Sequence, residues 1–466
     1  MHDAPPTPLA PAPEPLSHGL KQRHLTMLGL GGVIGAGLFV GSGAGIAVAG
    51  PGIVLSYLIA GALAMLIMRM LGEMSAAMPA SGAFSVHAER ALGRWAGFSV
   101  GWLYWFLLVV VLAVEATGAA RIANSWMPGV PQWAWVLVFM VVFTVANLAA
   151  VKNFGEFEFW FAGLKVGAIV LFLVLGVLAI VGWLPAASDF SGEPVGLANL
   201  TGQGGFLPNG WDGVVSGVLA VVFAFGGLEV VTIAAAESED PARNVARAVR
   251  SAVWRILFFY VGSMLVIVTL LPWTAMEPGQ SPYVAVLDAL GVPAAGQIMN
   301  IVVFVALLSA LNANLYGSSR MVFSLAERGE APKGLLAVSG GGVPRRAVLA
   351  SVAFGFVSVL LNLKWPDSVF LYMLNAVGAV LLFVWGLIAV SQLRLRRRIE
   401  REAPEKLTLR MWGFPWLTWA ALAAMAAVLV LMLLDDGSRP QVLWSAAATG
   451  AVLGVAWVRE SRTRPE

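Results

Sequence analysis

Long apolar segments recur along nearly the whole chain and constrain its fold more than any other feature. Each is about 20 residues long, enough to cross a ~30 Å hydrocarbon core as an α-helix. Only 12% of the residues are charged, whereas an ordinary soluble domain has about 25%. The segments lie at 26–48, 52–74, 97–124, 132–151, 157–182, 212–234, 250–272, 294–323, 346–364, 367–391, 414–434 and 441–458. The pattern predicts an all-α integral membrane protein with twelve transmembrane helices.

The distribution of lysine and arginine predicts the orientation of these helices. With the N-terminus inside, 25 of the 29 basic residues fall on the inner side, and the outer loops 183–211 and 272–296 contain none. The exceptions are Arg121, Lys364 and Arg439 near outer loops, and Lys165 within a span. By the positive-inside rule, both termini are expected in the cytoplasm, with the chain in the cytoplasmic (inner) membrane.

Composition excludes several functional classes. The net charge of +3 comes from basic residues in inner loops, so it does not indicate a nucleic-acid partner. The chain has no cysteine, and its four histidines (His2, His18, His24, His87) lie outside the apolar segments, so we expect no cofactor and no metal site. A membrane enzyme is disfavoured because no nucleophile–base pair appears. A channel is disfavoured because single charges do not form the rings of a selectivity filter.

The first apolar segment contains a glycine-rich stretch, GLGGVIGAGLFVGSGAG, at residues 29–45. Glycine in a helix interior costs roughly 1 kcal/mol relative to alanine, so an uninterrupted helix is disfavoured here. One interpretation is a helix unwound near Ile34, Gly35, Ala36 and Gly37, whose freed N–H groups face a substrate carboxylate. The other is close helix packing through glycines four residues apart. Both can hold together.

The sixth apolar segment is the second one that looks broken. It reads FAFGGLE from Phe223 to Glu229, with Phe225 before the pair Gly226 and Gly227. A charged group in mid-membrane costs at least ~2.5–3.5 kcal/mol and needs a reason. Glu229 could bind freed backbone N–H groups, gate the site or help hold a substrate ammonium. Alternatively, it is a protonated carboxyl that only satisfies the broken backbone.

Two broken spans five helices apart indicate an inverted repeat with a binding site at the membrane midplane. We expect a disordered cytoplasmic tail at 1–20, a first five-helix repeat at 21–185 and a second at 186–396. Helices 11 and 12 follow at 397–466. Nothing in the pattern specifies an oligomeric state.

Two further charges lie within spans. Lys165 is eight residues beyond Phe157, roughly 12 Å into the membrane. It either carries the coupling proton, with Gly163 and Gly167 allowing another backbone to approach its amine, or extends to the inner surface. Glu115 either titrates, contacts a substrate amine, or is hydrogen-bonded to a neighbouring helix.

Other polar residues are expected to stabilise the helices or to lie in solvated loops. Most of the set Asn300, Ser309, Asn312 and Asn314 are expected to form interhelical hydrogen bonds. We expect solvated positions in inner loops for Glu73, Arg90, Glu156, Glu158 and the segment 237–244.

Nine motifs are spread along nearly the whole chain after residue 20. They are RHLTMLGLGGVIGAGLFVGSG at 23–43, AGPG at 49–52, MRMLGEM at 68–74, GRWAGFSVGWLYW at 93–105, VKNFGEFEFWFAGLKV at 151–166, FAFGGLEVVTIAAAES at 223–238, SRMVFSLAERGEAP at 319–332, AVSQLRLR at 389–396 and MWGFPWLTW at 411–419. Together they resemble the amino acid permeases of the amino acid–polyamine–organocation (APC) superfamily. The resemblance implies a LeuT-like 5+5 inverted-repeat fold with broken helices 1 and 6, and uptake of an amino acid with protons. It places the substrate site at 34–37 and 223–229, and Lys165 matches the helix-five lysine that replaces a sodium site in related permeases.

The resemblance leaves the substrate open between two branches. VVTIAAAES, GEFEFW and RMWGFPWLTW are similar to the γ-aminobutyrate permeases, whereas FAFGGLE is similar to the aromatic amino acid permeases. An ammonium held at 225–227 would suit an α-amino acid, and one reaching toward Glu115 would suit a γ-amino acid. We favour a proton-coupled symporter for γ-aminobutyrate or a similar small zwitterion, because more of the chain resembles that branch. The alternatives are an amino acid exchanger or a permease for aromatic or other α-amino acids.

Overall fold

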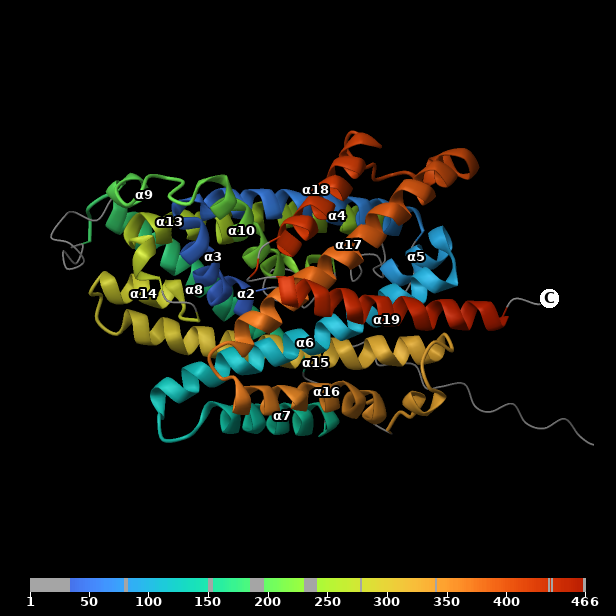
Figure 1. Cartoon of the computed structure of the whole chain (residues 1–466), viewed down its shortest axis with the longest axis horizontal. Helices are drawn as coiled ribbons and strands as arrows, with labels where there is room; N and C mark the ends of the chain where they lie inside the picture. The colour runs from blue at the N-terminus through green and yellow to red at the C-terminus, as the bar shows by residue number, and fades with distance from the viewer. Residues whose placement is uncertain are drawn as a thin grey trace, which may run out of the picture.

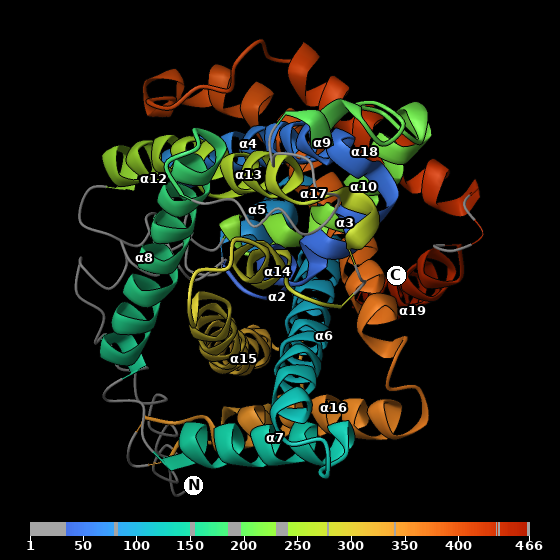
Figure 2. The same ribbon diagram turned by 90° about the vertical axis from the view of Figure 1, so that its left-hand side faces the viewer.

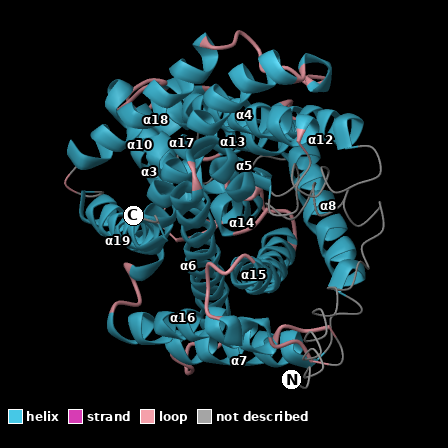
Figure 3. Ribbon diagram, turned by 90° about the vertical axis from the view of Figure 1, so that its right-hand side faces the viewer, coloured by secondary structure: helices cyan, strands magenta, loops and turns pink. Residues whose placement is uncertain are grey.

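The structure, a computed structural model, describes residues 34–78, 83–149, 154–184, 197–229, 241–276, 279–339, 342–434, 436 and 439–463. All regular elements in these ranges are helical (Figure 3). The elements of the first half are α2 (Ala36–Phe39), α3 (Gly41–Ala49), η1 (Gly50–Gly52), α4 (Ile53–Ala77), α5 (Ala83–Leu92), α6 (Arg94–Trp126), α7 (Gln132–Ala149), α8 (Phe154–Ile180), α9 (Ala198–Thr201), α10 (Gly210–Val221) and η2 (Val222–Phe225).

The second half begins with a span that contains a π-helical segment, η3. Its elements are α12 (Pro241–Arg255), η3 (Ile256–Gly262), α13 (Ser263–Leu270), η4 (Trp273–Ala275), α14 (Pro282–Ala289), α15 (Ala295–Glu327), η5 (Lys333–Leu336), α16 (Arg345–Lys364), α17 (Val369–Glu402), η6 (Pro404–Lys406), α18 (Trp416–Leu434) and α19 (Arg439–Thr463). The predicted tail at 1–20 lies outside the described residues.

Ten helical runs in the described ranges are long and apolar enough to cross a membrane. One run, Ala36–Ala77, has 42 residues, roughly 63 Å if straight and about twice the hydrocarbon core. The chain turns inside this run at η1, where Gly50 has φ 59°. α10 has 12 residues and η2 has 4, so each is too short to cross the hydrocarbon core alone. The all-helical membrane fold predicted from the sequence is therefore confirmed, with ten counted spans against the twelve expected.

The helices form a bundle with α6 and α15 packed against each other at its centre (Figure 2). In its apolar part, 78% of α6 is buried, against 17% of α7. α7 and α16 lie side by side at one edge, and α8 and α19 flank the bundle on opposite sides (Figures 2 and 3). Peripheral helices expose apolar side chains such as Trp160 at 68%, which is the expected surface for contact with lipid.

The short connecting helices separate into two ends of the bundle. α9 and α14 lie at one end, and α5 lies at the other with the C-terminal end of α19 (Figure 1). α9 and α14 belong to the two connections that contain no lysine or arginine. The observed ends thus divide the connections in the way the basic residues do.

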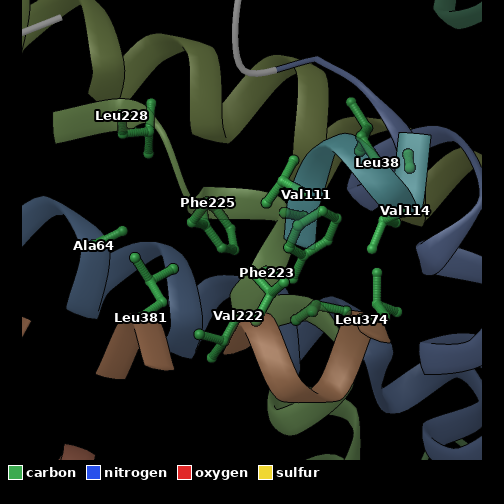
Figure 4. Close-up of a cluster of buried hydrophobic side chains, with 14 of the residues drawn as sticks. Leu38, Ala64, Val111, Val114, Val222, Phe223, Phe225, Leu228, Leu374 and Leu381 are labelled. Atoms are coloured by element: carbon green, nitrogen blue, oxygen red, sulfur yellow. The ribbon is translucent and has the colours of Figure 1, made fainter. Parts of the chain in front are cut away.

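Span six is interrupted at Gly226 and Gly227, as predicted, whereas span one is interrupted at Val40, beyond the predicted 34–37, because Ala36 and Gly37 lie in α2. The two interruptions contact each other. α2 has only four residues and is separated from α3 at Val40 (φ −123°, ψ −45°). In span six, η2 ends in extended backbone at Gly226 (φ −61°, ψ 139°), followed by Gly227 at φ 93°. A Cβ on Gly37 would lie 2.7 Å from Ala224 Cα, so the two broken segments touch through backbone. Side chains from α2, α4, α6 and α17 surround this contact (Figure 4).

Glu73, expected in a solvated inner loop, is instead buried at 1% exposure. Gln392 Nε2 donates to its Oε1 at 2.6 Å, and the backbone N–H of Met411 donates to its Oε2 at 2.6 Å. The guanidinium of Arg396 forms an ion pair with the same Oε2. The expectation was wrong because the inner end of α4 packs against α17 and the segment before α18, so this carboxylate is buried with its partners.

A buried histidine on α5 gives a first prediction. His87 is fully buried, with its Nε2 3.3 Å from Ser75 Oγ. Burial, and secondarily the charge of Arg90, lowers its pKa to about 4. As pH falls from about 6.5, the unfolded chain binds the proton first, so stability is lost down to about pH 4 and then levels off. When the pH is lowered from 7 to 4.5, the free energy of unfolding should fall for the wild type, and it should fall by about 2 kcal/mol less for His87→Gln. Identical pH profiles in denaturant unfolding would contradict this role.

The contact between the two breaks gives a second prediction. A Cβ at position 37 meets backbone that cannot move aside, whereas at position 41 its nearest neighbour is 3.4 Å away, an ordinary contact. Gly37→Ala should therefore cost about 1–3 kcal/mol through overpacking. Gly41→Ala, the matched control, should be neutral or gain up to about 1 kcal/mol in helix propensity. Thermal unfolding of the purified proteins measures both, and equal losses would show that the breaks do not define a special contact.

Candidate functional site

The N-terminus of α2 is bound by a carboxylate from another span. Glu115, on α6 and 3% exposed, accepts the backbone N–H of Ala36 at 3.1 Å with each of its two oxygens. A Cβ on Gly35 would lie 2.5 Å from Glu115 Oε1, so glycine is required for this approach. The start of α2 therefore offers the N–H of Ala36 to an anion, and here the anion is a protein side chain, not the substrate carboxylate that was expected.

The break in span six provides a second group of polar atoms. The backbone N–H groups of Gly227 and of Glu229 itself bond to the Glu229 carboxylate. This carboxylate is buried at 1% exposure, and Phe225 beside the break is fully buried, with Phe223 at 7%. Glu229 thus satisfies part of the opened backbone.

The Glu229 carboxylate has two aromatic neighbours. Tyr104 of α6 and Trp385 of α17 lie beside the carboxylate. Among the described residues, Glu229 Oε1, Tyr104 Oη and Trp385 Nε1 have no hydrogen-bond partner of standard geometry. Buried polar atoms normally have partners, and the Tyr104 hydroxyl and the Trp385 N–H are the donors beside this carboxylate, so the three groups form one buried polar cluster at the edge of the second break. Neither aromatic residue was singled out from the sequence.

Lys165 is buried on α8, at 1% exposure. Its Nζ lies 3.8 Å from Glu158 Oε1, which also accepts the hydroxyl of Ser309 of α15 at 2.8 Å. The amine therefore does not extend to the surface. The charge of Glu115 also acts on Lys165, so a buried amine lies between two carboxylates.

Two expectations around Lys165 were wrong. Glu158, assigned to a solvated loop, is fully buried. It precedes Lys165 by seven residues, two helical turns on the same face of α8, and this spacing could have revealed the pair. No other backbone approaches Gly163 or Gly167 among the described residues, because there nothing lies within 4 Å of a Cβ built on either.

The polar residues of α15 divide between structure and site. Asn312 accepts the side-chain amide of Asn147 at 2.8 Å, and Asn314 bonds to the carbonyl of Ala310 at 2.7 Å. The first is an interhelical bond between α7 and α15, as expected, whereas the second lies within α15. Ser309 differs, because its partner is the carboxylate that faces Lys165.

Comparison with known proteins agrees with this arrangement. The amino acid permease family model matches residues 24–458. The gamma-aminobutyric acid permease of Bacillus subtilis (strain 168) is 49% identical over 438 residues, covering 94% of this chain and 92% of the relative. The aromatic amino acid transport protein AroP of Corynebacterium glutamicum is 48% identical over 454 residues, covering 97% and 96%. The gamma-aminobutyric acid permease of Escherichia coli (strain K12) is 46% identical over 434 residues, covering 92% and 91%.

The chain is a multi-pass helical bundle, and the family model matches nearly its whole length. It belongs to the amino acid permease family and transports amino acids.

Proposed function

We propose that this permease is a proton-coupled symporter that imports γ-aminobutyrate or a similar small zwitterion across the cytoplasmic membrane. The observation that carries the proposal is the chain of buried charges beside the two breaks. Glu115 binds the first break, and its charge acts on Lys165, which faces Glu158. A proton carrier and a substrate site would then share one carboxylate.

Twelve spans in a LeuT-like 5+5 inverted repeat would account for the observed runs. η1 would divide Ala36–Ala77 into spans one and two, and α10 with η2 would begin the broken span six. The repeats would fall at 21–185 and 186–396. Both termini would be cytoplasmic, because α9 and α14, which lie in connections without lysine or arginine, share one end of the bundle.

The substrate carboxylate would bind at the N-terminus of α2, where Ala36 N–H now bonds to Glu115. Two carboxylates cannot both occupy one N–H, and like charges at this distance repel. Substrate binding would therefore require Glu115 to take up a proton or move aside. This competition would couple the substrate to a proton without direct contact between them.

The proton would pass from Glu115 to Lys165 and on to Glu158. The amine of Lys165 lies within interaction range of both carboxylates, and Ser309 fixes the Glu158 oxygen nearest to the amine. The second oxygen of Glu158 has no hydrogen-bond partner within the described part of the chain. It is therefore free to accept a proton on the way to the cytoplasm.

The substrate ammonium would lie near Glu229. Glu115 sits at the carboxylate end of the site, so it is poorly placed to receive a distal ammonium. The Glu229 carboxylate, buried beside Tyr104 and Trp385, is an acid at the second break. Relatives named for γ-aminobutyrate and for aromatic amino acids are nearly equally similar. An ammonium at span six suits an α-amino acid, whereas the motifs at 151–166 and 411–419 resemble the γ-aminobutyrate branch. We favour γ-aminobutyrate because these motifs cover more of the chain.

Lys165 and Glu158 provide the test of proton coupling. In proteoliposomes with an inward pH gradient, Lys165→Ala should reduce concentrative uptake to the level of protein-free liposomes, while substrate binding persists. Glu158→Gln removes one charge-assisted bond and should lower the rate about tenfold or more. Glu156→Gln, a half-buried position on the same helix, is the matched control and should transport normally. Wild-type accumulation by Lys165→Ala would sink the proton role and favour an exchanger.

Substrate identity is tested by competition against radiolabelled γ-aminobutyrate. Unlabelled γ-aminobutyrate should compete, and phenylalanine and tryptophan should not, because the two charged ends of the ligand are fixed by the two breaks. Uptake of radiolabelled phenylalanine or tryptophan that excess γ-aminobutyrate does not reduce would assign the chain to the aromatic branch. That result would leave the proton test unaffected.

A further inference from the structure

A cavity lined by arginine lies between α5 and the end of α17. Its volume is about 350 Å³, and the residues that line it are Arg90, Ala91, Arg394, Leu395, Arg397, Arg398, Arg401 and Glu402. Arg394 Nη1 donates to the carbonyl of Ala91 at 3.5 Å, which joins the two walls. This cavity is separate from the transport site and takes no part in the function proposed above.

The cavity lies at the level where lipid headgroups are expected. α17 has 34 residues, roughly 51 Å, whereas about 20 residues cross the hydrocarbon core. The uninterrupted apolar run of α17 ends at Val390. Arg394 follows little more than one turn later, so the mouth of the cavity falls in the interfacial region. This placement rests on the cytoplasmic orientation proposed above.

The lining has a large excess of positive charge. Five guanidinium groups face one carboxylate, Glu402, and within the described ranges Arg398 is the only lining arginine with an ion pair. Arg396, in the same arginine run, points elsewhere and is neutralised by Glu73 and Glu400. The helix thus pairs Arg396 and Arg398 with carboxylates, and leaves Arg394, Arg397 and Arg401 lining the cavity without an ion pair among the described residues. An anion would relieve their repulsion.

We propose that this cavity binds the phosphate group of an anionic phospholipid of the cytoplasmic leaflet. Guanidinium groups bind phosphate oxygens in pairs through parallel N–H donors, and basic pockets on the cytoplasmic side suit anionic headgroups. A lipid is favoured over a free phosphate because membrane insertion would hold its headgroup at the depth of Arg394, and because apolar Leu395 also lines the cavity. The bound headgroup would join α5 to α17, one turn from the Glu73–Arg396 pair that ties α17 to α4.

Thermal unfolding in neutral detergent with added lipid tests this proposal. Phosphatidylglycerol should raise the Tm of the wild-type protein at concentrations where phosphatidylcholine does not. A basic residue near the surface contributes about fivefold to binding of anionic lipid, so Arg394→Gln with Arg397→Gln should require roughly 30-fold more phosphatidylglycerol. The control, Arg250→Gln with Arg345→Gln, removes the same charge from exposed positions outside the cavity and should behave as wild type.

Further arms separate the remaining outcomes. Inorganic phosphate and glycerol 3-phosphate at constant ionic strength should leave the Tm unchanged, and an equal shift with either would assign the cavity to a soluble anion and overturn the proposal. Equal lipid dependence in the double variant and its control would also overturn it. If the double variant is not monodisperse, Arg397→Gln alone should still show about a fivefold loss.

Discussion

The absence of water in the bilayer core is the constraint on which this structure depends. Each opened backbone group in a span must find a partner inside the protein. The two breaks meet this requirement in the same way, with Glu115 on the N–H of Ala36 and Glu229 on the N–H of Gly227. In one case the carboxylate comes from another helix, and in the other from two residues further along. Helix opening and buried acid therefore occur together, because neither would be stable without the other.

The same constraint explains why two of the buried carboxylates have a basic partner. Removing one partner of a buried pair leaves an uncompensated charge that costs about 3–5 kcal/mol. Glu73 is matched by Arg396 at one end of α4, and Glu158 by Lys165 on α8. The two pairs differ in what else they hold. Glu73 has further donors from Gln392 and Met411, which fix it in place, whereas Glu158 keeps one oxygen free among the described residues. The first arrangement suits a structural link, whereas the carboxylate in the second is less constrained.

Sequence reasoning located the elements better than the partners. Helix α16 spans Arg345–Lys364 against a predicted 346–364, and interruptions of spans one and six were anticipated from glycine, because hydrophobic length and helix propensity are local properties. Glu73 and Glu158 were misassigned because each lies near a span end, where composition cannot show which face packs inward. The bond between Glu115 and Ala36 joins positions 79 apart, a distance over which periodicity carries no information. Spacing along α8 did contain the Lys165–Glu158 pair, and only the assumption of a solvated loop hid it.

The geometry at Ala36 also limits how the transporter can work. In the proposed mechanism, Glu115 would lose its bond to the N–H of Ala36 when a substrate carboxylate binds there, so the gain from substrate binding would be reduced by the loss of the internal bond. A proton on Glu115 removes this opposition, since a neutral carboxyl neither repels the substrate nor binds the N–H groups as strongly. Gly35 makes the arrangement possible by leaving room for the carboxylate, and Lys165 lies near enough for its charge to act on the same group. In the proposed mechanism, coupling is a competition between the substrate carboxylate and Glu115 for the N-terminus of α2. Gly35 makes this competition possible because its missing side chain leaves room for Glu115.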